Sequence, residues 1–143
     1  MNTAHHLRRR AMTLVEVLAV VVILGLIAGL AVVGFSGTFR QAKHETAKSQ
    51  IAIITGKIEA YMISTSRHPS SSEGLGALTD APPVAAHHLS EDAILDPWGR
   101  TFLYVSPGPE GHPYEVISLG EDGARGGEGP AADISSTSLR ATG

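Results

Sequence analysis

Hydrophobic and polar positions divide the chain into three successive patterns. Residues 17–35 contain no charged side chain, and a helix of about 19 residues rises roughly 28 Å, close to the hydrocarbon thickness of a bilayer. From residue 38 to about residue 66, apolar side chains recur at spacings of three and four, as they do on an amphipathic helix. The part after residue 66 is rich in glycine and proline. This pattern predicts a helix that is first apolar on all sides and then amphipathic.

The two helical patterns belong to one element, because no proline stands between Leu14 and Ser66. We therefore predict a continuous helix of about 50 residues, roughly 75–80 Å long. His68-Pro69 predicts its end, since the residue before a proline is disfavoured in the α region. The serines at 70–72 predict a capped turn into a short helix that reaches Leu78.

Turn residues separate two short extended segments in the C-terminal part. The run Asp96-Pro97-Trp98-Gly99-Arg100 predicts a turn before a strand at 101–105, and residues 107–111 predict a tight connection. Residues 112–118 alternate like a returning antiparallel strand, and the polar tail 135–143 is expected to fray. The expected fold class is α+β, with a long N-terminal helix packed on a short helix and a small antiparallel sheet of two or three strands.

Charge at the start of the chain predicts the orientation of the apolar segment. Arg8-Arg9-Arg10 precede it, and positive charge on a short flank holds that flank in the cytoplasm. The bulk of the chain is then outside, as one small domain of roughly 100 residues. The chain has no cysteine, so such an exported domain needs a long packed helix or a bound metal in place of disulfides.

Composition and motifs disfavour two function classes. The net charge is −3 and no basic patch with interleaved aromatic residues is present, which disfavours nucleic-acid binding. The chain has no cysteine nucleophile, no Gly-x-Ser-x-Gly motif and no His-Glu-x-x-His motif. An enzyme therefore has little support.

Glu16 is an acidic residue at the start of the apolar run. A carboxylate near hydrocarbon costs roughly 2.5–3.5 kcal/mol, so it usually has a partner. The alternative is that Glu16 lies at the level of the lipid headgroups. Energetics alone leave both interpretations open.

The segment Ala11-Met12-Thr13-Leu14-Val15-Glu16 follows a basic leader and opens an apolar helix. It resembles the class III signal of type IV pilins and pseudopilins, Gly-Phe-Thr-Leu-x-Glu, although Ala11 replaces the usual Gly and Met12 the usual Phe. The resemblance implies that prepilin peptidase cleaves between Ala11 and Met12, that Met12 is N-methylated, and that Glu16 pairs with the N-terminal ammonium of a neighbouring subunit. An ordinary secretory signal cleaved near residues 31–34 is the alternative.

A second set of motifs covers nearly the whole chain and is similar to the G-type major pseudopilins of the type II secretion system. The motifs are His68-Pro69, Glu73-Gly74-Leu75, Asp96-Pro97-Trp98-Gly99, Tyr104, Pro107-Gly108, Tyr114, Ser118-Leu119-Gly120-Glu121-Asp122-Gly123, Gly126-Gly127-Glu128-Gly129 and Ala132-Asp133-Ile134. The resemblance implies a type IV pilin-like fold and a structural subunit that polymerises with itself into a periplasmic pseudopilus, which drives protein export across the outer membrane.

The same resemblance implies a location and a set of partners. Residues 1–11 would be a cleaved leader, residues 12–35 a transmembrane and assembly helix, and residues 36–143 a periplasmic domain of a single-pass inner-membrane protein. The implied partners are minor pseudopilins, the inner-membrane secretion platform and prepilin peptidase.

Two other functions are weighed against the pseudopilus subunit. One is a type IV pilin for adhesion or DNA uptake, and the other is a signal-anchored metal-binding or hydrolytic domain that never polymerises. The acidic glycine-rich loop and the lack of C-terminal cysteines favour the pseudopilus subunit over a type IV pilin.

Residues 119–133 form a glycine-rich loop in which Asp122 and Asp133 flank the run 123–129. Calcium takes about six to eight oxygens from carboxylates and backbone carbonyls, and this loop supplies both kinds. The family resemblance implies a Ca²⁺ site formed by the Leu119 carbonyl, Asp122 and Asp133, with Glu128 as a further candidate.

One departure concerns this site, because Ala131 stands where many relatives have another aspartate. Either the affinity falls, or Glu128 or water substitutes, or the loop holds without a metal. A pairing of Arg125 with a carboxylate would also weaken the calcium site.

Overall fold

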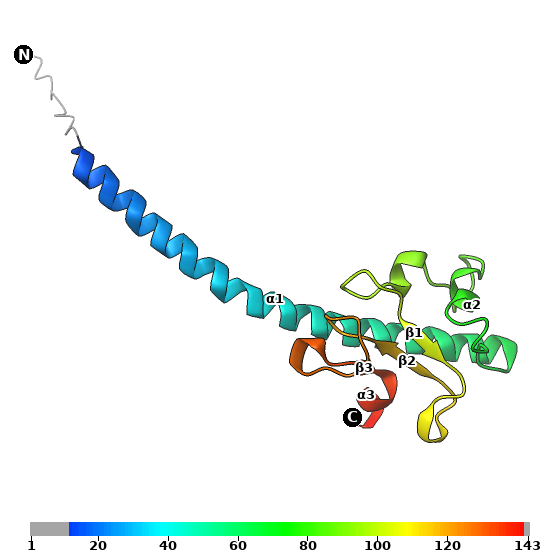
Figure 1. The fold of residues 1–143 in the computed structure, drawn as a ribbon. Coiled ribbons are helices and arrows are strands. Elements are labelled where there is room, and N and C mark those ends of the chain that lie inside the picture. The colour runs from blue at the N-terminus through cyan, green and yellow to red at the C-terminus, as the bar shows by residue number, and fades with distance from the viewer. Residues whose placement is uncertain (1–11, 142–143) are drawn as a thin grey trace, which may run out of the picture. The chain divides into compact units, whose positions relative to one another are not determined.

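The computed structural model describes residues 12–141. It describes their side chains as well, except those of residues 31–36 and 141. The chain divides into two compact units, Met1–Thr38 and Phe39–Gly143. A single helix of 52 residues, α1 (Leu14–Thr65), contributes to both (Figure 1), which confirms the predicted continuous helix. The predicted leader, including Ala11, lies outside the described residues.

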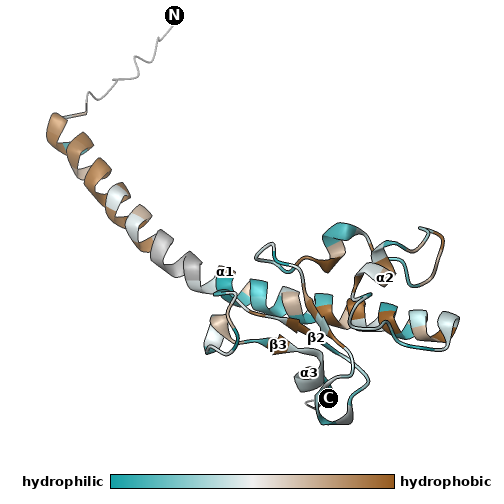
Figure 2. Ribbon diagram, turned by 45° about the vertical axis from the view of Figure 1, so that its right-hand side comes forward, coloured by the Kyte–Doolittle hydropathy of each residue, from teal (hydrophilic) through white to brown (hydrophobic). Residues whose placement is uncertain are grey.

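In the first unit, the apolar half of α1 is uncovered. Its large side chains are exposed along the whole described stretch, from Leu14 at 87% to Leu30 at 76%, and Figure 2 shows this half mostly in the hydrophobic colour. Over the part of the chain that the structure describes, no helix is both long and apolar enough to cross a membrane. The membrane span over 12–35 therefore stays a prediction.

In the second unit, α1 buries one stripe of side chains. Ala47, Ile51, Ile54, Ile58 and Tyr61 are at most 8% exposed, and their spacing of four and three residues keeps them on one face. They form the core with residues from the C-terminal part of the chain, which are Leu75, Leu78, Leu89, Phe102, Tyr114, Val116 and Ile134. The C-terminal part thus covers the amphipathic stripe, as the sequence predicted.

The helix ends slightly before the predicted proline. Ser66 has a φ of 60°, and its amide donates to the Met62 carbonyl at 2.7 Å. This left-handed residue closes the last turn. The predicted serine-capped turn follows, because the Ser70 hydroxyl accepts from the amide of Glu73 at 3.3 Å. It leads into the short helix α2 (Gly76–Thr79), whose own N-terminus has no side-chain cap.

The sheet has three antiparallel strands in the order β1-β2-β3. They are β1 (Leu103–Val105), β2 (Glu115–Ser118) and β3 (Ile134–Ser135), with three 3-10 turns, η1 (Glu91–Ile94), η2 (Pro109–Gly111) and η3 (Gly129–Ala131). Tyr104 pairs with Val116, and Ser118 with Ile134. The strands are shorter than predicted, because Thr101 forms only an isolated bridge with Leu95. The α+β class is confirmed.

Residues 135–140 of the C-terminal tail lie in β3 and in a further helix, so the prediction of fraying is wrong for them. After β3 comes a helix, α3 (Ser136–Ala141), which packs on β2 and β3. Ser136 is buried, and its hydroxyl accepts from the Val116 amide at 3.0 Å. Arg140 donates to the Tyr114 hydroxyl at 2.7 Å. These tertiary contacts, which a polar tail sequence does not reveal, fix the segment.

Candidate assembly segment and cation-binding loop

The N-terminus of α1 is capped by Thr13. The Thr13 hydroxyl accepts from the Glu16 amide at 3.2 Å, and the Thr13 carbonyl accepts from the amides of Glu16 and Val17 at 3.1 and 3.2 Å. A carboxylate in the first turn also interacts favourably with the helix dipole. The sequence prediction assigned these residues to a processing signal and Glu16 also to assembly, although the Thr-x-x-Glu spacing is in addition a helix-start signal.

The side chains of this segment are uncovered within the described part of its unit. Glu16 is exposed, and the described residues include no ion-pair partner for it. Met12, the predicted first residue after cleavage, is 61% exposed. A Cβ atom added at Gly25 or Gly29 would meet no atom within 4 Å. The helix face that carries these two glycines is therefore open to close approach by another helix.

The loop 119–133 returns on itself, as its flanking aspartates predicted. The Asp133 carboxylate accepts from the Gly126 amide at 3.0 Å, and the Asp133 amide donates to the Gly126 carbonyl at 3.2 Å. The Glu121 amide donates to the Pro130 carbonyl at 3.0 Å. Asp122 is exposed, and its carboxylate accepts from the Ala124 amide at 3.0 Å.

The crossing of the loop at Gly127 needs a glycine. Gly127 has a φ of +80°, and a Cβ there would lie 2.4 Å from the Ala131 carbonyl oxygen. The backbones at Gly127 and Ala131 thus lie in close contact where the loop closes.

The oxygens of this loop fit a cation in part. Asp133 Oδ1 is buried and has no hydrogen-bond partner among the described residues, and an orphaned carboxylate oxygen is costly without a compensating charge. Glu128, just before η3, is exposed. The described residues contain no group of three or more His, Asp or Glu side chains that could hold a metal. A metal here would depend on two carboxylates and on backbone carbonyls such as that of Leu119.

The loop is tied to the turn at 96–100 by a residue that sequence reasoning assigned only to that turn. Arg100 donates to the carbonyls of Gly120 and Glu121. Asp96, which is 5% exposed, accepts from the Trp98 amide at 3.0 Å and from the Ser118 hydroxyl at 2.9 Å. The predicted turn is therefore present and also positions the first residues of the loop.

A polar network joins α1, β2 and α3. The hydroxyl of the fully buried Tyr114 donates to the Glu59 carboxylate at 2.7 Å and accepts from Arg140. Burial raises the pKa of Tyr114 far above its usual value of 10.0, and the hydrogen bond to Glu59 raises it further. The Tyr114 hydroxyl, the Glu59 carboxylate and the Arg140 guanidinium all have partners in this network, which therefore fixes the packing of the three elements.

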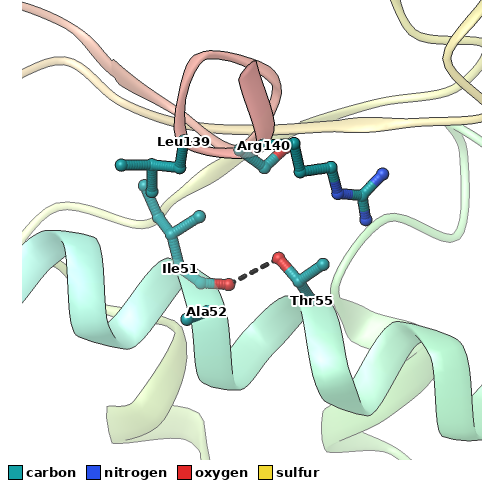
Figure 3. A pocket seen from close by; sticks show the side chains of 6 residues that line it. Ile51, Ala52, Thr55, Leu139 and Arg140 are labelled. Atoms are coloured by element: carbon teal, nitrogen blue, oxygen red, sulfur yellow. Dashed lines mark hydrogen bonds between the residues drawn. The ribbon is translucent and has the colours of Figure 1, made fainter. Parts of the chain in front are cut away.

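A shallow hollow of about 280 Å³ lies between α1 and α3 (Figure 3). Leu139 lies over Ile51 on one side, and the Thr55 hydroxyl donates to the Ile51 carbonyl at 2.6 Å. The one charged side chain of the lining is Arg140, whose guanidinium is engaged by Tyr114 and Glu59. The hollow offers no acid and base pair among the described residues.

Comparison with known proteins identifies the family to which this chain, with its apolar helix and glycine-rich loop, belongs. Residues 35–137 match the family model for type II secretion system (T2SS), protein G, and residues 6–32 match the prokaryotic N-terminal methylation motif. The chain belongs to the protein G family of the type II secretion system. It is a major pseudopilin, a structural subunit of secretion machinery and not an enzyme.

Several members of the protein G family are similar over most of their length. The type II secretion system core protein G of Vibrio cholerae is 34% identical, and the match covers 93% of this chain and 94% of the relative. The corresponding protein of Pseudomonas aeruginosa is 37% identical, with 85% of this chain and 90% of the relative covered. That of Escherichia coli K12 is 34% identical, with 85% and 88% covered.

A solved structure supports the pseudopilin fold. The major pseudopilin from the type 2 secretion system of enterohaemorrhagic Escherichia coli superposes with a TM-score of 0.56 at 23% identity, covering 73% of this chain and 95% of that one. The predicted type IV pilin-like fold is thus confirmed. As a protein G pseudopilin, the chain assembles into a pseudopilus with other components of the type II secretion system.

Proposed function

We propose that the first half of α1 both anchors this pseudopilin in the inner membrane as a single span and joins its copies into a homopolymer, with residues 36–143 in the periplasm. The observation that carries the proposal is the uncovered apolar surface of residues 12–30. Such a surface requires lipid or other helices around it. The open faces of Gly25 and Gly29 support helix packing.

In this proposal, prepilin peptidase cleaves between Ala11 and Met12, and Met12 is then N-methylated. The match to the N-terminal methylation motif over residues 6–32 supports this step. The exposed Glu16 carboxylate would receive the N-terminal ammonium of a neighbouring copy, which provides the partner that a carboxylate near lipid needs. Minor pseudopilins and the inner-membrane secretion platform would be the other partners.

Charge neutralisation tests the pairing. Glu16→Gln should insert into the inner membrane like the wild type but give a strongly reduced yield of sheared pseudopilus fibres. Glu110→Gln removes the same charge from an exposed turn and should leave the yield unchanged. A normal fibre yield of Glu16→Gln would contradict the pairing, and a loss of insertion would show that Glu16 acts before assembly.

We also propose that the loop 119–133 binds Ca²⁺ through Asp122, Asp133 and the Leu119 carbonyl, with Glu128 as a further oxygen donor. The buried, unpartnered Asp133 Oδ1 and the returning glycine-rich backbone support this proposal. When bound, the ion would supply positive charge to these oxygens. Two carboxylates make a weaker calcium site than three.

Thermal unfolding and calorimetric titration with CaCl₂ test the metal. Calcium should raise the melting temperature of the wild type relative to chelator, and Asp133→Asn should abolish this rise while keeping an acceptor for the Gly126 amide. Asp92→Asn, an exposed residue of η1, is the matched control and should keep the rise. Equal melting temperatures of the wild type in calcium and in chelator, without heat of binding, would contradict a calcium site.

A further inference from the structure

We propose that the guanidinium of Arg100 is a built-in cation that holds the first turn of the loop 119–133, so that this turn folds without a metal ion. The proposal goes beyond the calcium site and does not depend on it.

The backbone of Arg100 is held by Asp96, because the Arg100 amide donates to Asp96 Oδ1 at 2.9 Å. Arg100 Nε lies 3.8 Å from Asp96 Oδ2, within ion-pair distance, and has no hydrogen-bond partner among the described residues. Asp96 is itself immobilised, because it is buried and accepts from the Ser118 hydroxyl at the end of β2. The arginine thus starts from a hydrogen-bonded turn, and its Nε lies beside a buried carboxylate.

The head of the side chain reaches the start of the loop. Nη2 donates to the Gly120 carbonyl and Nη1 to the Glu121 carbonyl, the latter at 3.4 Å. Gly120 is buried, and a buried carbonyl needs a partner. Calcium also binds backbone carbonyl oxygens in loops. The guanidinium thus binds oxygens of the kind that a calcium ion would otherwise bind.

The loop is built around this guanidinium. Gly123 has a φ of +69°, and a Cβ at this position would lie 2.8 Å from Nη1 of Arg100. A residue with a side chain would have to displace the arginine or open the turn. Glycine therefore permits both the left-handed conformation and the close approach of the loop to the cation.

A second cation approaches the same turn from α1. Arg40 Nε lies 3.3 Å from a carboxylate oxygen of Glu121, and the Glu121 amide is bonded to the Pro130 carbonyl. Two positive side chains thus flank residues 120–121. Because like charges repel, a divalent ion would be confined to the part of the loop that contains Asp122 and Asp133.

Hydrogen exchange of the full chain in detergent micelles, with chelator present, tests the proposal. Arg100→Gln should speed exchange in peptides covering 119–133 by at least about tenfold, while peptides of β1 and of α1 beyond Phe39 keep their rates. Arg125→Gln is the matched control, because it removes the same charge from an exposed position of the same loop. Arg100→Lys should give an intermediate rate, since an ammonium cannot donate in a fork to both carbonyls.

The opposite results are equally specific. Exchange in 119–133 that is as slow in Arg100→Gln as in Arg125→Gln would overturn the proposal, and so would a uniform increase over the whole unit, which indicates general destabilisation. Fast exchange of the wild-type loop in chelator, slowed only by calcium, would show that the metal holds the turn instead.

A calcium series separates this proposal from the metal site. Calcium should slow exchange in the loop of Arg100→Gln by a larger factor than in the wild type, because the variant frees two carbonyls and loses a repelling charge. If calcium changes the exchange rates of no variant, the proposed calcium site is contradicted. Faster exchange confined to the loop of Arg100→Gln in chelator still supports the built-in cation.

Discussion

The two halves of α1 share one backbone conformation but differ in what covers them. The half after residue 39 packs five side chains into a core supplied by its own chain, whereas the described side chains of the half before residue 31 are exposed. A helix can therefore be specified over its whole length although only part of its surface is buried within the monomer. The remaining surface is the one that we propose to contact lipid and other subunits.

The same substitution, isoleucine to alanine, should affect stability very differently in the two halves of α1. Ile58→Ala should lower the free energy of unfolding by about 2–5 kcal/mol, because Ile58 is fully buried and leaves a cavity. Ile27→Ala, at a position that is 58% exposed, should leave it unchanged. Denaturant unfolding in micelles, followed by the fluorescence of Trp98, measures both. Equal losses would mean that the first half is also packed by the second unit.

A smaller effect is expected where α1 joins the sheet through a polar contact. Tyr114→Phe should cost about 1–2 kcal/mol in the same unfolding assay, because the Glu59 carboxylate and the Arg140 guanidinium lose the hydroxyl between them. Tyr104→Phe, whose hydroxyl donates to the Pro69 carbonyl at 2.8 Å, should cost less, since its partner is neutral. The reverse order would show that the network adds nothing to a simple hydrogen bond.

Alkaline pH should loosen the same junction. The pKa of Tyr114 is raised in the folded protein, mainly by burial, so above pH 10 the unfolded chain releases a proton that the folded chain retains. Stability should therefore fall as pH rises past 10.0, the usual pKa of tyrosine, by about 1 kcal/mol over the next unit. Tyr114→Phe should remove this part of the decline. An unchanged pH profile in Tyr114→Phe would contradict the assignment.

The smallest effect is expected just beyond the end of α1, at an exposed ion pair. Arg67 donates two hydrogen bonds to Glu73, at 2.7 and 2.6 Å, and holds the pKa of Glu73 well below its usual value of 4.5. A lowered carboxylate pKa stabilises the fold above the unfolded value, and this contribution is lost as pH falls below 4.5. Glu73→Gln should thus lower the melting temperature slightly at neutral pH and hardly at all in acid.

A matched exposed pair tests that last expectation. Glu45 interacts with Lys48 at 2.9 Å but lacks the forked guanidinium and the Ser70 contacts that Glu73 receives. Glu45→Gln should therefore shift the melting temperature less than Glu73→Gln. Solvent screening keeps both effects small, and an equal shift would mean that the forked geometry adds no stability.

Much of this protein was determined by the sequence alone. The apolar run, the three-four spacing and the absence of proline predicted α1 as one helix with two different halves, because these signals are local. The turn at 96–100, the returning strand and the flanking of the loop by Asp122 and Asp133 were predicted for the same reason. The family followed from motifs in order along the chain.

Tertiary structure decided what depends on residues distant in sequence. The order of the tail follows from Ser136 bonding to β2 and Arg140 bonding to Tyr114, which a polar composition conceals. The role of Arg100 likewise cannot be predicted from the turn that contains it, because the carbonyls to which it donates lie about twenty residues later along the chain. Local patterns specify which elements form, whereas only the packed fold decides which charge meets which oxygen.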